Sequence, residues 1–196
     1  NEFLAEKADI IAVSGQVVLP DTVMLPRGRM ISVPIASPAY IKEHGEIQHP
    51  SELKNHRIFS NLYENRYSFK AHYPLQKGEE MITFSGIETI RLSSVDMVLQ
   101  AVRDSLGVSP SVPLFHCIDD LERGTVVPVL NGWHRPCRPN YIVCRKSDWN
   151  IGYIRDFMHW WSEELTAIET AAENRFEALF GRELLDEYRS PLGSDH

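Results

Sequence analysis

Cysteine is scarce in this sequence of 196 residues. Three cysteines are present, Cys117, Cys137 and Cys144, with spacings of 20 and 7 residues. An odd number at these spacings fits neither a disulfide framework nor a Cys-x-x-Cys metal site. We therefore expect reduced thiols, as in cytoplasmic proteins, and no cofactor.

Basic residues are fewer than acidic ones. Lys and Arg number 20 and Asp and Glu number 27, which gives a formal net charge of -7. Proteins that neutralise phosphates usually present a basic face, and the sequence contains no cluster of Lys and Arg. By itself, this chain is a poor candidate for binding nucleic acid.

Long hydrophobic runs are also lacking. No apolar run reaches the roughly 18 residues that span a bilayer. The first residues, NEFLAEKADIIAV, do not combine a charged region with an apolar one, so no secretory signal is predicted. Hydrophobic residues make up 43% of the chain and charged residues 24%, a balance typical of soluble globular proteins. We expect a cytoplasmic protein with no membrane partner.

Short apolar runs alternate with helical patterns. Strands are predicted at residues 8–13, 30–36, 57–62, 125–130 and 140–146, with two around Gly86 and a hairpin within 63–80. The clearest helix is SSVDMVLQAVRDSLGV, in which Ser93 and Asp96 have capping-box spacing and Gly107 ends the helix. Ser51 is predicted to cap a short helical turn. The alternation predicts an α/β fold with a mostly parallel sheet.

Hydrolase residue types, Ser37, Glu43 and His44, occur together in IASPAYIKEHG (residues 35–45). However, Ser37 before Pro38 fits the cap and first position of a helix that Gly45 can end. A capping serine directs its oxygen at backbone N–H groups, and the sequence has no G-x-S-x-G motif. No catalytic residue is expected.

Histidine offers a possible metal site. His49, His56 and His72 are spaced by 7 and 16 residues, which matches no common metal site. We expect these side chains to lie at the surface and to bind no metal.

The last helix is predicted to place an apolar stripe on one face: Ile154, Phe157, Met158, Trp161, Leu165 and Ile168. Residues 171–190 continue the helical pattern. Trp160 and Trp161 cannot share a face, because neighbours lie about 100° apart on a helix. One of them is expected to face a partner or an adjacent element.

Four segments of the chain follow one another in a recognisable order: FLAEKADIIAVSG, ISVPIASPAYIKEHGEIQHPSELKNHRIF, SSVDMVLQAVRDSLGVSPSVP and PLFHCIDDLERGTVVPVL. Together they resemble the effector-binding (regulatory) domain of LysR-type transcriptional regulators, over roughly residues 2 to 165. The chain departs from the family pattern in places. Ser105 replaces the first glycine of a G-x-G motif, SPSVP is one residue longer than usual, and the tail beyond Thr166 is long. The family's first strand and helix are not found.

The resemblance implies two Rossmann-like α/β subdomains joined by crossing strands, like a type 2 periplasmic binding protein. Subdomain I would hold residues 1–50 and 140–175, subdomain II residues 51–139, and residues 176–196 would form a C-terminal extension. A small organic, anionic effector would bind between the subdomains. A winged helix-turn-helix domain outside this chain would bind DNA, and the protein would form homodimers or homotetramers without being an enzyme. A stand-alone solute-binding protein of similar fold is the alternative.

Effector-binding residues are expected where strands and helices end. Ser14 and Gly15 follow a predicted strand, where α/β folds form their crevices, and Ser60 ends another. Ser93 and Ser94 begin the clearest helix, whose N-terminal N–H groups and partial positive charge suit a carboxylate.

Overall fold

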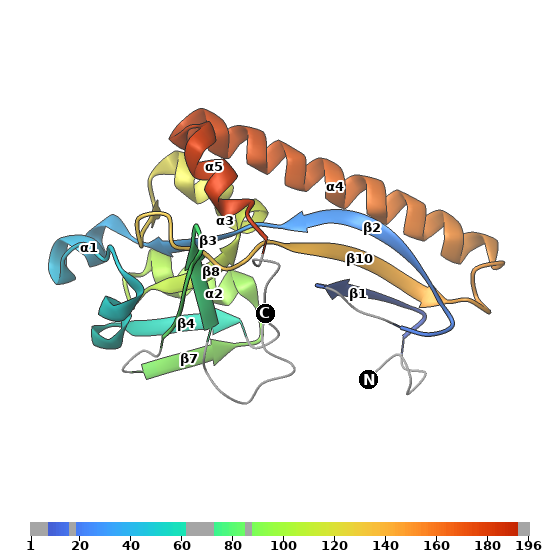
Figure 1. Cartoon of the computed structure of the whole chain (residues 1–196), viewed down its shortest axis with the longest axis horizontal. Coiled ribbons are helices and arrows are strands. Elements are labelled where there is room, and N and C mark those ends of the chain that lie inside the picture. Colours follow the sequence, from blue (N-terminus) through green and yellow to red (C-terminus); the bar gives the residue numbers. More distant parts are fainter. Residues whose placement is uncertain (1–7, 16–18, 62–72, 85–87, 192–196) are drawn as a thin grey trace. The chain divides into compact units, whose positions relative to one another are not determined.

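The computed structural model describes residues 8–15, 19–61, 73–84 and 88–191 (Figure 1). The chain forms two compact units. Unit 1 comprises Asn1–Met30 and Arg138–Ala172, and unit 2 comprises Ile31–Cys137 and Glu173–His196. The chain therefore passes between the units three times, after residues 30, 137 and 172. His72 and Gly86 lie outside the described residues, as does part of the expected hairpin within 63–80.

Unit 1 is built on a three-stranded antiparallel sheet with a helix along one face (Figure 1). In spatial order the strands are β1 (Ile10–Ser14), β10 (Arg138–Arg145) and β2 (Thr22–Met30), and the helix is α4 (Gly152–Phe180). Ile142 and Cys144 are two residues apart on β10, so their side chains lie on one face of the sheet. There they pack against Ile154 and Met158, which are four residues apart on one face of α4. All four side chains are buried, and they form the core of unit 1.

Strand β2 was not predicted from the sequence, because the strand expected at residues 30–36 corresponds to β3 (Ser32–Ala36), which follows it. Pro26 and Gly28 weaken its strand pattern, because proline cannot donate to a ladder and glycine packs nothing. The structure places both on an edge strand, where the register against β10 shifts between Pro139 and Tyr141. Gly28 has φ +77°, a conformation that suits glycine at such an irregularity.

Unit 2 holds the other described strands and helices. Its strands are β3 (Ser32–Ala36), β4 (Arg57–Asn61), β5 (Tyr73–Lys77), β6 (Glu80–Phe84), β7 (Glu88–Leu92), β8 (Ser109–Pro113) and β9 (Val127–Pro128). Its helices are α1 (Pro38–His44), the 3-10 helix η1 (Pro50–Asn55), α2 (Val95–Arg103), α3 (Leu114–Arg123), α5 (Arg182–Tyr188) and the end of α4. Strand β3 lies between β8 and β9, β4 pairs with β7, and β5 pairs with β6.

The prediction of a mostly parallel sheet is wrong for the described residues. Among the strand pairs in this part of the chain, β4 with β7 is parallel, and the pairs in the three other sheets are antiparallel. In unit 1, β10 arrives late in the chain and inserts between β1 and β2 in the opposite direction to both. Strands β5 and β6 are joined by a tight turn, which only an antiparallel pair allows.

Helix ends follow the predictions at α1 and depart from them at two other helices. Ser37 caps α1, accepting from the Tyr40 N–H at 3.2 Å, and Gly45 ends it with φ +88°. Helix α2 is capped by Ser94, not by Ser93, and ends at Arg103, before Gly107. In η1 the cap is His49 rather than Ser51, because the Glu52 carboxylate reaches back to the His49 N–H and completes a capping box.

The compact units divide the chain at other points than the subdomains implied by the family resemblance. Tyr40 and Leu53 are buried in one core with Ile58 and Val108, so residues 31–50 pack within unit 2. The C-terminal residues also join unit 2, where the rings of Phe176 and Tyr188 lie 5.6 Å apart. Both side chains are completely buried.

Candidate functional site

The expected effector-binding residues are distributed over both units. Ser14 and Gly15 belong to unit 1, and Ser60, Ser93 and Ser94 belong to unit 2. The surroundings of each group show what it could offer to a ligand.

Ser14 begins a chain of polar contacts in unit 1. Its hydroxyl donates to the Asn140 side-chain oxygen at 2.6 Å, and the Asn140 amide donates to the Glu169 carboxylate at 3.3 Å. The proton of Ser14 is therefore engaged, and its lone pairs remain to accept from a ligand hydroxyl or amine. Gly15, with φ +90°, donates its N–H to the Pro139 carbonyl at 2.8 Å.

Glu169 is the buried end of this polar chain. It is 6% exposed, and a Cβ added at Gly28 would collide with its carboxylate. Nearby, burial lowers the pKa of Arg27, while the Glu169 charge acts in the opposite direction. The Glu169 carboxylate thus lies against Gly28, and the Arg27 guanidinium is close enough to interact with it electrostatically.

Asn140 and Glu169 were missed by the sequence predictions, although Glu169 left a signal. Ile154, Met158, Trp161, Leu165, Glu169 and Ala172 recur at three- and four-residue intervals, so Glu169 is a charged residue within a buried and partly buried stripe. A buried carboxylate needs partners, which the ends of β10 and β2 supply.

The serines of unit 2 differ in accessibility. Ser93 is exposed, and Ser94 is half-buried, with its hydroxyl accepting from the Asp96 N–H at 3.2 Å. The N-terminus of α2 offers N–H groups to an anion, although the Asp96 carboxylate in the first turn opposes one. Ser60 is completely buried in β4 and is paired with Arg91 of β7 in the sheet register.

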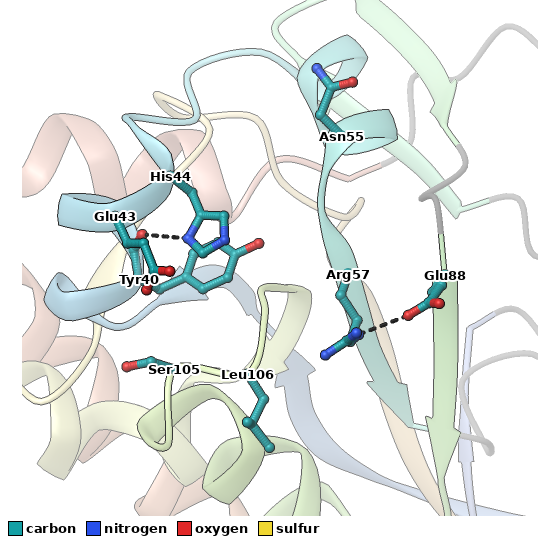
Figure 2. A pocket seen from close by; sticks show the side chains of 8 residues that line it. All are labelled: Tyr40, Glu43, His44, Asn55, Arg57, Glu88, Ser105 and Leu106. Atoms are coloured by element: carbon teal, nitrogen blue, oxygen red, sulfur yellow. Dashed lines mark hydrogen bonds and ion pairs between the residues drawn. The ribbon is translucent and has the colours of Figure 1, made fainter.

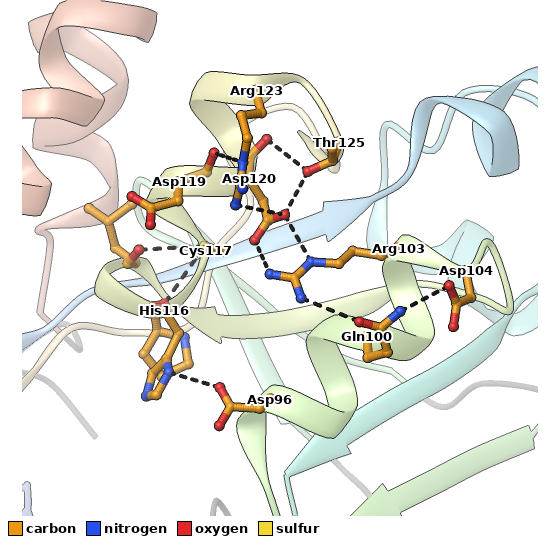
Figure 3. Close-up of polar contacts among 12 residues, drawn as sticks. Asp96, Gln100, Arg103, Asp104, His116, Cys117, Asp119, Asp120, Arg123 and Thr125 are labelled. Atoms are coloured by element: carbon orange, nitrogen blue, oxygen red, sulfur yellow. Dashed lines mark hydrogen bonds and ion pairs between the residues drawn. The ribbon is translucent and has the colours of Figure 1, made fainter.

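Helix α2 is fixed by a polar network with α3 (Figure 3). The Arg103 guanidinium donates to both carboxylate oxygens of Asp120, with one contact of 2.8 Å, and the Thr125 hydroxyl donates to Asp120 at 2.6 Å. Burial acts to raise the pKa of Asp120, but the hydrogen bonds from Arg103 and Thr125 outweigh it, so the pKa is lowered. A charged Asp120 therefore holds the C-terminal end of α2 against α3.

Unit 2 also contains a hollow of about 400 Å³ that the sequence did not predict (Figure 2). It is lined by Tyr40, Glu43, His44, Asn55, Arg57, Glu88, Ser105 and Leu106. On one side the His44 ring stacks on the Tyr40 ring, with centroids 4.1 Å apart, and on the other Arg57 donates to Glu88 at 2.8 Å. The hollow thus presents charges of both signs.

Two of the three residues that suggested a hydrolase, Glu43 and His44, line this hollow, and Ser37 contacts Ser105 beside it. The His44 ring donates from Nδ1 to the Tyr40 carbonyl at 3.2 Å, while the Ser37 oxygen caps α1. Across the described part of the chain, no hydrogen bond joins Ser37 to His44. Ser37 instead lies 2.8 Å from the hydroxyl of Ser105, whose φ of +58° lies in the left-handed region that favours glycine.

The described ranges of the chain contain neither a metal-binding cluster of side chains nor a membrane-spanning helix. Within these ranges, no three His, Cys, Asp or Glu side chains form a group that could hold a metal ion. None of the helices in the described part is both long and apolar enough to cross a membrane.

Comparison with known proteins identifies the family. The model of the LysR substrate binding domain matches residues 1–166. The chain belongs to the family of LysR substrate-binding domains. It is thus an α/β regulatory domain of the type 2 periplasmic-binding-protein kind, the effector-sensing part of a LysR-type regulator.

Two curated relatives of this LysR domain are transcription regulators. A probable HTH-type transcriptional regulator, SinR of Salmonella typhimurium, is 28% identical over 152 residues, which is 76% of this chain and 47% of that protein. An HTH-type transcriptional repressor of Pseudomonas aeruginosa is 25% identical over 147 residues, 71% of this chain and 46% of the repressor. The chain therefore spans about half the length of the curated relatives it matches.

A solved structure supports the same fold. The regulatory domain of CrgA, a LysR-type transcriptional regulator from Neisseria meningitidis, is similar with a TM-score of 0.67 and 20% identity. The match covers 84% of this chain and 78% of that domain.

Proposed function

We propose that this LysR domain senses a small organic molecule and controls the DNA binding of a transcription regulator in the cytoplasm. The match to the LysR substrate binding domain over residues 1–166 carries the proposal. The DNA-binding activity would belong to another part of the protein, since the two curated relatives are HTH-type regulators about twice as long as the matched region.

The proposed ligand carries an anionic group and a hydrogen-bond donor. The N–H groups at the start of α2 other than that of Asp96, which Ser94 caps, would take a carboxylate beside Ser93 and Ser94. Within unit 1, Ser14, whose proton is engaged by Asn140, would accept from a ligand hydroxyl or amine beside the Gly15 backbone. Ser60 would act indirectly, because it is completely buried.

Thermal-shift screening with small hydroxy acids and amino acids tests the ligand class. A ligand at one hundred times its Kd should stabilise the domain by about 2.7 kcal/mol. We expect Ser14→Ala and Ser93→Ala each to raise, at least fivefold, the ligand concentration needed for a given thermal shift. The shift of each variant is measured from its own ligand-free melting temperature. Ser51→Ala, also an exposed serine, is the matched control. Shifts that persist unchanged in both site variants would show that these serines do not form the site.

The regulatory role needs the full-length protein. We expect the same small acid to change the affinity for the promoter DNA by at least fivefold, measured by fluorescence anisotropy at fixed salt. A ligand that stabilises the domain and leaves DNA binding unchanged would contradict transcriptional control and would favour a solute-binding role.

A further inference from the structure

Helix α4 carries an exposed apolar stripe on its outer face within unit 1. Tyr153, Phe157 and Trp160 are 76%, 45% and 55% exposed, whereas Ile154 and Met158 are buried on the face toward the sheet. The ring centroids of Phe157 and Trp160 lie 5.5 Å apart, so the stripe is continuous there. Adjoining large apolar side chains that remain open to water usually mark a binding surface.

The stripe has the spacing of a helix-packing seam. The residues concerned, here called the α4 seam, are Tyr153, Phe157, Trp160, Glu164, Ala167 and Ala171. They recur at intervals of four and three residues, and all six are exposed. Alternating intervals of four and three are the pattern by which helices interlock side by side. The partner that fits this surface is therefore another helix.

The sizes of the seam residues indicate which helix. The N-terminal half of the seam is bulky and the C-terminal half is small. A second copy of α4 in antiparallel orientation would pair Tyr153 with Ala171, Phe157 with Ala167 and Trp160 with Glu164. Each large ring then meets a smaller side chain, as close packing requires. A parallel copy would place ring on ring at one end and alanine on alanine at the other.

The available area suits a weak but specific dimer. A fully covered aromatic side chain buries about 150–250 Å², so the exposed fractions of the three seam rings amount to roughly 350 Å² per copy. Ile168, 46% exposed, lies beside the seam and adds to this area. With Ile168 included, these side chains of two copies would together bury roughly 850 Å², which is in the range of weak, transient interfaces.

We propose that two copies of this chain associate through their α4 seams in antiparallel orientation. Glu164 would lie near the two-fold axis, beside the partner's Trp160. Within the described ranges, Glu164 forms no ion pair that would compete with this contact. One polar residue in an apolar helix interface fixes the register and lowers the affinity. The proposal specifies the surface of the assembly implied by the family, and it does not depend on the effector.

Sedimentation velocity of the whole chain over roughly 5–500 µM tests the proposal. We expect a reversible monomer–dimer equilibrium in this range. Trp160→Glu should weaken association at least tenfold, and Glu164→Leu should strengthen it about tenfold by removing the desolvated charge. Leu179→Glu is the matched control, since Leu179 is an exposed apolar residue of α4 outside the seam.

A second variant distinguishes an interface effect from misfolding. Ala167 is exposed, so Ala167→Trp should leave the circular dichroism spectrum and melting temperature of the monomer unchanged while blocking the space that the partner's Phe157 would occupy. A dimer that survives both Trp160→Glu and Ala167→Trp would overturn the α4 surface, as would a chain that stays monomeric throughout. Either result would leave effector sensing intact, because ligand-induced thermal shifts report on that function separately.

Discussion

Gly28 cannot be replaced by another residue without straining the backbone. Its φ of +77° disfavours any Cβ, and the Glu169 carboxylate occupies the space that a Cβ would need. Gly28→Ala should therefore lower the free energy of unfolding by about 2–4 kcal/mol, measured by urea denaturation.

Gly45→Ala is the control for this prediction. Gly45 has a similar φ of +88°, but no atom lies within 4 Å of its expected Cβ. The Gly45→Ala substitution should therefore lower the free energy of unfolding by about 1 kcal/mol, through backbone strain alone. Equal losses for the two variants would show that the contact with Glu169 contributes nothing.

The thiols are predicted to be unreactive in the folded state. Cys117 and Cys144 are completely buried and Cys137 is 6% exposed. Burial raises the pKa of Cys117 and of Cys144, which depletes the reactive thiolate. With Ellman's reagent at pH 8, we expect less than one thiol to react within minutes and three to react at once in guanidinium chloride. One rapidly reacting thiol in the native protein would contradict this.

At the scale of the helix, the C-terminal segment completes the core of unit 2. Tyr188 of α5 is completely buried, and its ring lies 5.3 Å from that of His134 and 5.6 Å from that of Phe176. Tyr188→Ala should destabilise the protein by about 3–5 kcal/mol in urea denaturation, as large buried aromatic residues do. Leu179→Ala, at an exposed position, should cost less than about 1 kcal/mol. A Tyr188→Ala cost as small as that would show that α5 is dispensable.

The sequence predicted elements with strong local signals and missed those decided by distant contacts. Ser37, Pro38 and Gly45 define both ends of α1 through local hydrogen bonds, so that helix could be predicted. Strand β2 contains Pro26 and Gly28, and only its pairing with a strand more than a hundred residues later makes it a strand. Local propensity contains no information about that partner.

The residues of the candidate site also include some with local sequence signals and others that only distant contacts bring together. Ser14 and Ser94 could be chosen because they stand next to a strand end and a helix start. Asn140 and Glu169 reach Ser14 only through the fold, and the hollow beside Tyr40 joins four separate stretches of the chain. The direction of the Ser14 hydroxyl, which decides what a ligand must offer, depends on those distant partners.

At the scale of the whole molecule, buried and half-buried histidines make the free energy of unfolding depend on pH. Burial lowers the pKa of His56, with the His44 charge adding to the effect and Glu52 opposing it. Burial also lowers the pKa of His116 and of His134. In the unfolded chain each histidine binds its proton at a higher pH, near 6.5, so unfolding takes up protons between the folded and unfolded pKa values.

The free energy of unfolding should therefore fall as the pH drops from about 7 to about 5. Urea denaturation at intervals across this range would measure the slope. His56→Gln should reduce the slope by removing one of the three groups, whatever its effect at neutral pH. A stability that is flat or that rises toward pH 5 would contradict the assignment.

The three passages of the chain between its units have a consequence for biosynthesis. Each unit is assembled from two segments that are far apart in the sequence, and unit 2 receives its last buried side chains from α5. A ribosome synthesises these segments in order, so unit 2 lacks Phe176 and Tyr188 until the segment that contains α5 has been made. Neither unit can finish folding during the early part of translation, and a nascent chain stalled before α5 would expose unfinished core to chaperones and proteases.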